Sequence, residues 1–196
     1  MRLRRKSKGS LMAEFTANIY VLFIFLVFPL LDISVLGFRS FFLWFAANQA
    51  VGAACKAKTY LQPVDVSISG SVRKKTYPSA CDLACSKANE VKDMFSGIHW
   101  EESDNNPDVQ IVREPINPKD REVEAAKIFT RGHGAPLGSF DTPDSNRYVY
   151  TCRVIIKGQV DPLVTFPFFK IPGLSGPIDM TVSSQAEFEN LPGLIK

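Results

Sequence analysis

The stretch FTANIYVLFIFLVFPLL, from Phe15 to Leu31, contains no charged residue and decides the fold of the chain. If Asp32 is tolerated, the apolar character continues through Phe38 to Arg39. A helix needs roughly 20 predominantly apolar residues to cross a bilayer. A buried core helix is the alternative, but this segment is apolar on all sides and a small domain could not readily enclose it. The sequence therefore predicts a transmembrane helix.

Basic residues gather in front of this helix. Of the 23 basic residues, five lie in the first nine positions, namely Arg2, Arg4, Arg5, Lys6 and Lys8. The excess is confined to this tail, whereas a nucleic-acid surface would need basic residues across the folded domain. By the positive-inside rule the tail stays in the cytoplasm and the chain after Arg39 lies across the membrane. We expect a single-pass protein with the lipid bilayer as a partner and no nucleic-acid partner.

The length of 196 residues leaves room for one membrane segment and one modest domain. We expect a basic leader over residues 1–9, a transmembrane and stalk helix over 10–60, and an extracytoplasmic domain over 61–196. A secretory signal peptide would have a shorter apolar core, followed closely by small residues at a cleavage site. Neither feature is present.

A different processing signal precedes the apolar run. The stretch KGSLMAEF, from Lys8 to Phe15, has a glycine, four residues, a glutamate and an aromatic residue. It resembles the prepilin peptidase motif of type IV pilins and pseudopilins. The resemblance implies cleavage between Gly9 and Ser10, and pairing of Glu14 with the amine that cleavage frees on a neighbouring subunit. A carboxylate at the mouth of a membrane helix is costly unless it is paired. Alternatively, Glu14 is a first-turn residue favoured by the helix dipole.

The first third of the chain also resembles the TadE-like pseudopilins of tight-adherence pilus systems. The residues that carry this resemblance are Glu14, Phe15, Asp32, Phe38, Arg39, Phe41, Phe42, Ala46, Ala47, Ala53 and Ala54. The family often has glutamate-phenylalanine-glycine where this chain has Asp32-Ile33-Ser34. The resemblance implies a non-enzymatic component of pilus assembly or secretion, held in the bacterial inner membrane with a periplasmic or extracellular domain. Its implied partners are other pilin or pseudopilin subunits, prepilin peptidase and the inner-membrane assembly platform.

Two residues interrupt the apolar helix. Pro29 removes a backbone donor and is expected to kink the helix. Asp32 either faces water at the helix exit or is a buried ion-pair partner. Further along, small residues form one face that suits another helix or the protein's own sheet, namely Ala46, Ala50, Ala53 and Ala57.

The remainder predicts an α+β domain in which a small antiparallel sheet packs against the stalk. Residues alternate as in strands over 64–68, 148–156 and 178–188. An apolar-aromatic run over 164–169 predicts a loop or edge that either covers the sheet end or contacts a partner. The proline-rich range of about 97–147 predicts an irregular insertion with a short helix from Pro118 to Phe129 after an Asn117 cap.

Four cysteines follow the membrane helix, namely Cys55, Cys81, Cys85 and Cys152. An even number on the extracytoplasmic side suggests two disulfides, for which three pairings exist. Cys81 and Cys85 are spaced for one face of a helix, so we expect them to reach different partners among Cys55 and Cys152. A zinc site is the alternative, although structural zinc pairs more often have two intervening residues. We expect no metal and no cofactor.

No nucleophile elbow, phosphate loop, metalloprotease motif or dinucleotide fingerprint is present. The two histidines, His99 and His133, lie in the predicted insertion, and the acidic cluster 101–104 reads as a solvated turn. We therefore expect a non-enzymatic protein. The competing hypotheses are an uncleaved signal-anchor protein that serves as a periplasmic binding or sensor module, and an anchored enzyme whose histidines converge with acidic residues.

Overall fold

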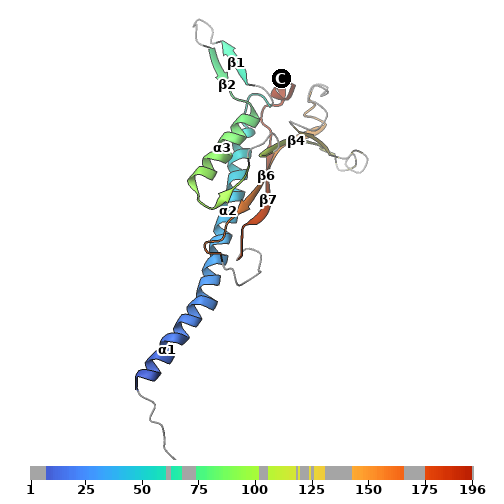
Figure 1. The fold of residues 1–196 in the computed structure, drawn as a ribbon. Coiled ribbons are helices and arrows are strands. Elements are labelled where there is room, and N and C mark those ends of the chain that lie inside the picture. The colour runs from blue at the N-terminus through green and yellow to red at the C-terminus, as the bar shows by residue number, and fades with distance from the viewer. Residues whose placement is uncertain are drawn as a thin grey trace, which may run out of the picture. The chain divides into compact units, whose positions relative to one another are not determined.

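The computed structural model describes residues 8–60, 63–67, 74–101, 106–117, 119, 124, 126–130, 143–165 and 175–195 (Figure 1). The chain forms two compact units. The first unit combines the helical segment up to Phe38 with the chain segment Asp161–Ile178. The second combines Arg39–Val160 with Asp179–Lys196.

The helical part of the first unit consists of α1 (Lys8–Leu22), the π-turn η1 (Phe23–Val27) and the beginning of α2 (Phe28–Ala54). The N–H of Phe28 donates to the carbonyl oxygen of Phe23, a bond across five residues that defines the π-turn. Pro29 follows directly, and its ring would clash with the carbonyl of the residue four positions earlier in a regular α-helix. The irregularity expected at Pro29 is therefore present as a π-turn directly before it.

The second unit contains an antiparallel sheet built on β6 (Tyr148–Val160). β4 (Asp108–Pro115) pairs with residues 148–155 of β6, and β3 (Ile98–His99) pairs with residues 159–160. β5 (Lys127–Thr130) pairs with β4, and β7 (Ile178–Glu187), all but its first residue in this unit, pairs with β6. The inward side chains of β6 form the centre of the core because alternate residues are buried, namely Tyr150, Cys152, Val154, Ile156 and Val160.

Helix α3 (Ala80–Met94) covers the part of α2 that belongs to the second unit. A capping box between Ser79 and Asp82 starts the helix by satisfying two backbone N–H groups. The rings of Phe42 on α2 and Phe95 at the end of α3 stack with centroids 3.7 Å apart. On the sheet side, Ser40 donates to the sulfur of Met180 at 3.1 Å. The C-terminal part of α2 thus lies between α3 and the sheet.

A separate two-stranded ribbon, β1 (Val64–Ser67) with β2 (Lys74–Tyr77), extends from this unit, and a 3₁₀ turn, η3 (Leu191–Ile195), ends the described chain. The predicted α+β class and the strands over 148–156 and 178–187 are confirmed. Of the strand predicted over 64–68, residues 64–67 form β1, but in this ribbon and not in the main sheet. The small residues Ala46, Ala50 and Ala57 are buried by the protein's own second unit.

Three sequence predictions are corrected. The stalk helix ends at Ala54 and not at residue 60, because the chain turns there to deliver Thr59 and Tyr60 to the start of α3. The range 97–147 contains three strands, so its prolines do not keep it irregular. The helix predicted over 118–129 is wrong at its end, where Lys127–Thr130 form β5 by pairing with the open edge of β4. Most of residues 118–125 lies outside the described residues.

Candidate membrane anchor and assembly site

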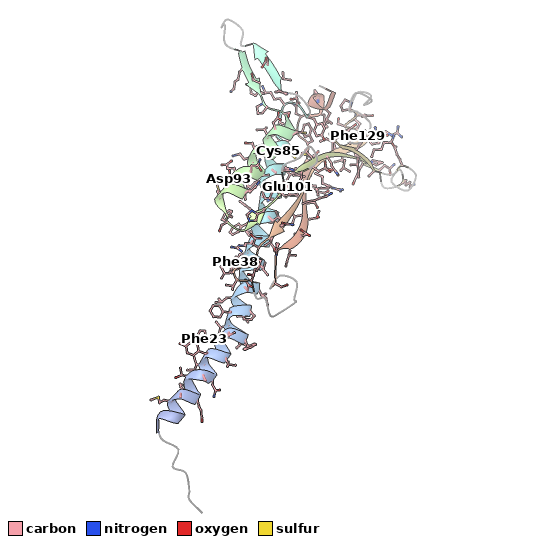
Figure 2. All side chains as sticks on the ribbon, in the orientation of Figure 1. Phe23, Phe38, Cys85, Asp93, Glu101 and Phe129 are labelled. Carbon is pink, nitrogen blue, oxygen red and sulfur yellow. The ribbon has the colours of Figure 1, made fainter. Side chains whose placement is uncertain are left out.

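In the first unit, the N-terminal helix exposes large apolar side chains from Met12 to Phe38. Within the described residues, the helical segment Met12–Ala54 is the one helix long and apolar enough to cross a membrane. Only 6% of its most apolar 18-residue window is buried, whereas the core helix of a soluble protein would be mostly buried. Phe23 and Phe38 project away from the helix and are 48% and 67% exposed (Figure 2). This segment fits a single-pass membrane anchor.

The residues of the predicted processing motif lie at the start of α1. The described part of α1 starts at Lys8, and Gly9 and Ser10 lie among its first residues. The side chains of these residues are outside the described part of the structure. Glu14 and Phe15 follow on the second turn, and both are exposed.

Asp32 is buried within the first unit, with 1% of its surface exposed. Its Oδ1 atom accepts the backbone N–H of Leu163 at 2.5 Å and that of Val164 at 3.2 Å. The Oδ2 atom is also buried and has no hydrogen-bond partner within the described residues. The water-facing alternative for Asp32 is therefore wrong. Asp32 is buried as the other alternative had it, but the partners that the structure gives it are backbone N–H groups and not the charged group of an ion pair.

The loop held by Asp32 turns apolar side chains outward. Leu163 is 54% exposed and Val164 is 42% exposed, while their backbone N–H groups point at the carboxylate. The remaining residues of the predicted apolar run, 166–169, lie outside the described residues. Sequence reasoning identified Asp32 and this run separately but did not connect them. The sequence signal that could have connected them was the lone carboxylate of Asp32 in one apolar segment, together with a second apolar segment at 164–169.

The cysteines lie in the second unit as four free thiols, so neither predicted disulfide is formed in this structure. Cys55, Cys81 and Cys152 are buried, and Cys81 and Cys85 lie on α3 as expected. The thiols of Cys55 and Cys152 are hydrogen-bonded to each other, which is not the arrangement that the sequence favoured. Cys55 Sγ also donates to the carbonyl oxygen of Ala186 at 3.4 Å.

The two thiols of this pair differ in acidity. The hydrogen bond with Cys152 lowers the pKa of the Cys55 thiol, and burial opposes this effect. The pKa of Cys152 is raised by the hydrogen bond with Cys55 and then by burial. Of this pair, Cys55 is therefore the more readily ionised thiol. Within the described residues, no group of three or more histidine, cysteine or acidic side chains could hold a metal ion.

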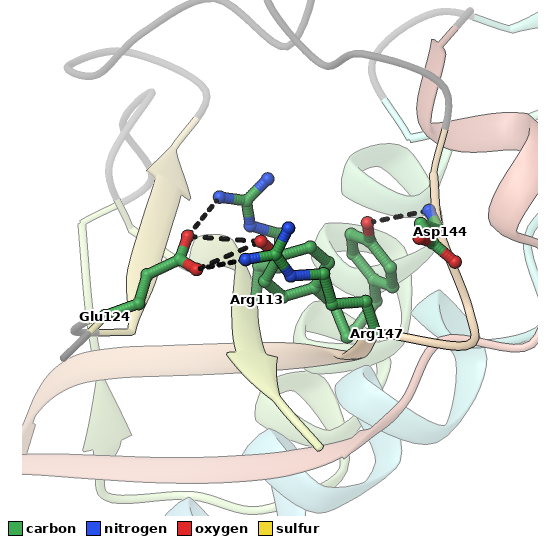
Figure 3. A network of polar contacts seen from close by, with 6 residues as sticks. Arg113, Glu124, Asp144 and Arg147 are labelled. Carbon is green, nitrogen blue, oxygen red and sulfur yellow. Dashed lines mark hydrogen bonds and ion pairs between the residues drawn. The ribbon is translucent and has the colours of Figure 1, made fainter. Parts of the chain in front are cut away.

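Two polar features of the second unit were not predicted. Glu124 accepts from Arg113 at 3.1 Å and from the hydroxyl of Tyr148 at 3.0 Å, and Arg147 approaches it at 3.7 Å (Figure 3). Burial, followed by this hydrogen bond to Glu124, raises the pKa of Tyr148. The network ties the strand β4 to the start of β6.

An open cleft of about 620 Å³ lies at the other end of β6. It is lined by polar and charged residues that include His99, Asn106, Lys157, Gln159 and Asp179. The second histidine, His133, lies outside the described residues, as does most of the acidic cluster 101–104. Comparisons with protein-family models, with curated proteins and with solved structures find no match, so the function of this chain is inferred from its own residues and geometry.

Proposed function

We propose that this chain is a TadE-like minor pilin or pseudopilin, a non-enzymatic membrane-anchored component of tight-adherence pilus assembly or secretion. The observation that carries the proposal is one exposed apolar helix that contains the processing motif Lys8–Phe15. In this reading the leader 1–9 is cytoplasmic and the second unit is periplasmic or extracellular. The anchor resides in the bacterial inner membrane.

Function then depends on assembly and not on catalysis. Prepilin peptidase hydrolyses the peptide bond between Gly9 and Ser10, and Ser10 becomes the new N-terminal residue with a free amine. This cationic amine pairs with the carboxylate of Glu14 on another subunit, because a charge at the mouth of a membrane helix is costly when unpaired. The apolar side chains of α1 pack among the helices of other subunits in the bilayer and at the assembly platform.

The placement of the two carboxylates supports the choice of Glu14 for this role. Glu14 is exposed on the second turn of α1, where another subunit can reach it. Asp32 is covered by the chain's own loop, and its Oδ1 atom is already occupied by two backbone N–H groups. Asp32 therefore serves the fold of the subunit, and Glu14 serves contacts between subunits.

The open polar cleft beside His99 favours the second candidate, an uncleaved signal-anchor protein that acts as a periplasmic binding or sensor module. In that case the helix would anchor the chain permanently and Glu14 would be an ordinary exposed residue of α1. The two candidates differ in one covalent bond, because only the pseudopilin loses residues 1–9.

The test is the N-terminal sequence of the full chain isolated from membranes of cells that contain a prepilin peptidase. We expect the mature protein to start at Ser10, and we expect Gly9→Ala to abolish this start. Gly37→Ala is the matched control, because a methyl group at this helical glycine meets no atom within 4 Å. An intact basic tail in the wild-type protein would overturn the pseudopilin proposal and favour the signal anchor.

A further inference from the structure

We propose that the loop segment Leu163–Thr165 is a second membrane-contacting element, that Asp32 holds it against the anchor helix, and that it contacts the lipid bilayer. This inference rests on the membrane anchoring in the proposed function but not on cleavage or pilus assembly. It assigns a lipid-facing role to a part of the chain that lies some 130 residues after the apolar helix. The hydrogen-bond partners Asp32 and Leu163 are 131 positions apart.

The position of Asp32 along the helix is the first step. About 20 helical residues cross the hydrocarbon core, and a span of that length starting at Phe15 reaches Ser34. Asp32 thus falls inside the last turn of the span. An ionised carboxylate facing lipid there is unfavourable, and such residues in membrane segments almost always find a partner inside the protein. Here the loop supplies that partner.

The orientation of the loop is the second step. The backbone N–H groups of Leu163 and Val164 face the carboxylate, so both are hydrogen-bonded, as backbone groups in hydrocarbon must be. The side chains of Leu163 and Val164 face outward, 54% and 42% exposed. The polar groups are therefore turned inward and the apolar groups outward, which is opposite to the arrangement expected of a loop in water.

The residues around the loop indicate that its exposed surface contacts lipid. On the helix, Leu31 and Ile33 flank Asp32 and are 46% and 61% exposed. The exposed residues Leu163 to Thr165 carry no charge. The loop therefore covers Asp32 and continues the uncharged, apolar surface of the anchor helix over it. A bilayer around that helix would meet both surfaces.

Fluorescence quenching in vesicles tests this placement. The full, uncleaved chain carries L163W in a W44F/W100F background, which removes the two native tryptophans. It is reconstituted in phosphatidylethanolamine/phosphatidylglycerol vesicles that contain acyl-brominated phosphatidylcholine. We expect acyl bromines to quench the L163W indole, and iodide in the buffer to quench it several-fold less than the control S86W. Ser86 is an exposed residue of α3.

Variants at Asp32 test the hydrogen bonds that hold the loop. D32L removes the acceptor while making the anchor helix more apolar, so we expect the chain to resist carbonate extraction while iodide quenching of the L163W indole rises several-fold. D32N keeps an Oδ1 acceptor and is expected to preserve most of the protection. Carbonate extraction of the wild-type chain, iodide quenching equal to that of S86W, or no effect of D32L would each overturn the proposal.

Two further outcomes separate this inference from its competitors. If protection of the L163W indole disappears as the protein-to-lipid ratio falls, a second copy of the chain covers the loop and the bilayer assignment is wrong. If the indole stays in lipid but the protein from cells keeps its basic tail, the pseudopilin proposal fails and the loop placement stands.

Discussion

The hydroxyl of Tyr60 donates a hydrogen bond to the backbone carbonyl oxygen of Val109 at 2.6 Å, and the tyrosine side chain is fully buried. This bond connects the segment after α2 to the central strand β4, across 49 positions of sequence. A buried carbonyl that loses its donor pays a desolvation cost of about 1–3 kcal/mol. Tyr60 is therefore a single side chain that links the end of the stalk helix to the sheet.

Tyr60→Phe is expected to lower the free energy of unfolding by about 1–2 kcal/mol, because it leaves the Val109 carbonyl unpaired while preserving the ring. Chemical denaturation of the detergent-solubilised full chain, followed by circular dichroism, measures this change. Tyr77→Phe is the control, because Lys58 and Lys75 contact the ring of Tyr77, which phenylalanine retains. Equal stabilities of the two variants would mean that the hydroxyl of Tyr60 contributes nothing.

Gly97→Ala is expected to destabilise the protein by at least about 1–2 kcal/mol, the cost of left-handed backbone for a residue with a Cβ atom. Gly97 has φ +80°, and an added Cβ would lie 2.3 Å from the guanidinium carbon of Arg39. Gly52→Ala is the matched contrast, because nothing lies within 4 Å of that position in α2. It is expected to stabilise the helix by up to about 1 kcal/mol. The same denaturation curves report both values, and a neutral Gly97→Ala would contradict the assigned backbone.

Mild oxidation of the full chain with oxidised glutathione is expected to join Cys55 to Cys152. The Cys55 thiolate attacks the glutathione disulfide, which forms a mixed disulfide between Cys55 and glutathione and releases one reduced glutathione. The Cys152 thiol then loses its proton and displaces the second, which forms the protein disulfide and leaves two reduced glutathione molecules. Peptide mapping by mass spectrometry identifies the linked peptides, and Cys85→Ser should leave the product unchanged. Linkage of Cys81 or Cys85 to either partner would favour the pairing that the sequence suggested.

Glu14→Ala is expected to permit cleavage after Gly9 yet to reduce pilus assembly strongly, because the freed amine of a neighbouring subunit loses its partner. Immunoblots for the processed form and for sheared surface pili separate the two effects. Asp93→Ala, which removes an exposed carboxylate from α3, is the control and should assemble normally. Normal pilus levels with Glu14→Ala would rule out the assigned role.

Local sequence was sufficient for elements whose pattern repeats along the chain. The alternation over Tyr148–Ile156 predicts β6 because one face of a strand packs into the core. The spacing of Cys81 and Cys85 predicts a shared helix, which α3 provides. The extent of the apolar segment is likewise visible without any tertiary information.

Elements defined by distant partners were not predictable in this way. The strand β4 has neighbouring prolines and two adjacent buried residues, Ile111 and Val112, so no clean alternation marks it. It forms because β6 offers a long edge for pairing. The burial of Asp32 depends on a loop 131 positions away, and the thiol contact of Cys55 depends on how β6 packs against the end of α2. Periodicity carries no information about such pairs.

The π-turn between α1 and α2 has a consequence for the two carboxylates of the anchor. Glu14 and Asp32 are 18 residues apart, which is five full turns of 3.6 residues, so in a regular α-helix they would stand on one line. A π-turn inserts the equivalent of one residue and rotates everything after it by about 100°. Phe23–Val27 therefore acts as an angular spacer. It directs Glu14, proposed to contact a neighbouring subunit, and Asp32, which binds the chain's own loop, to different sides of the same helix.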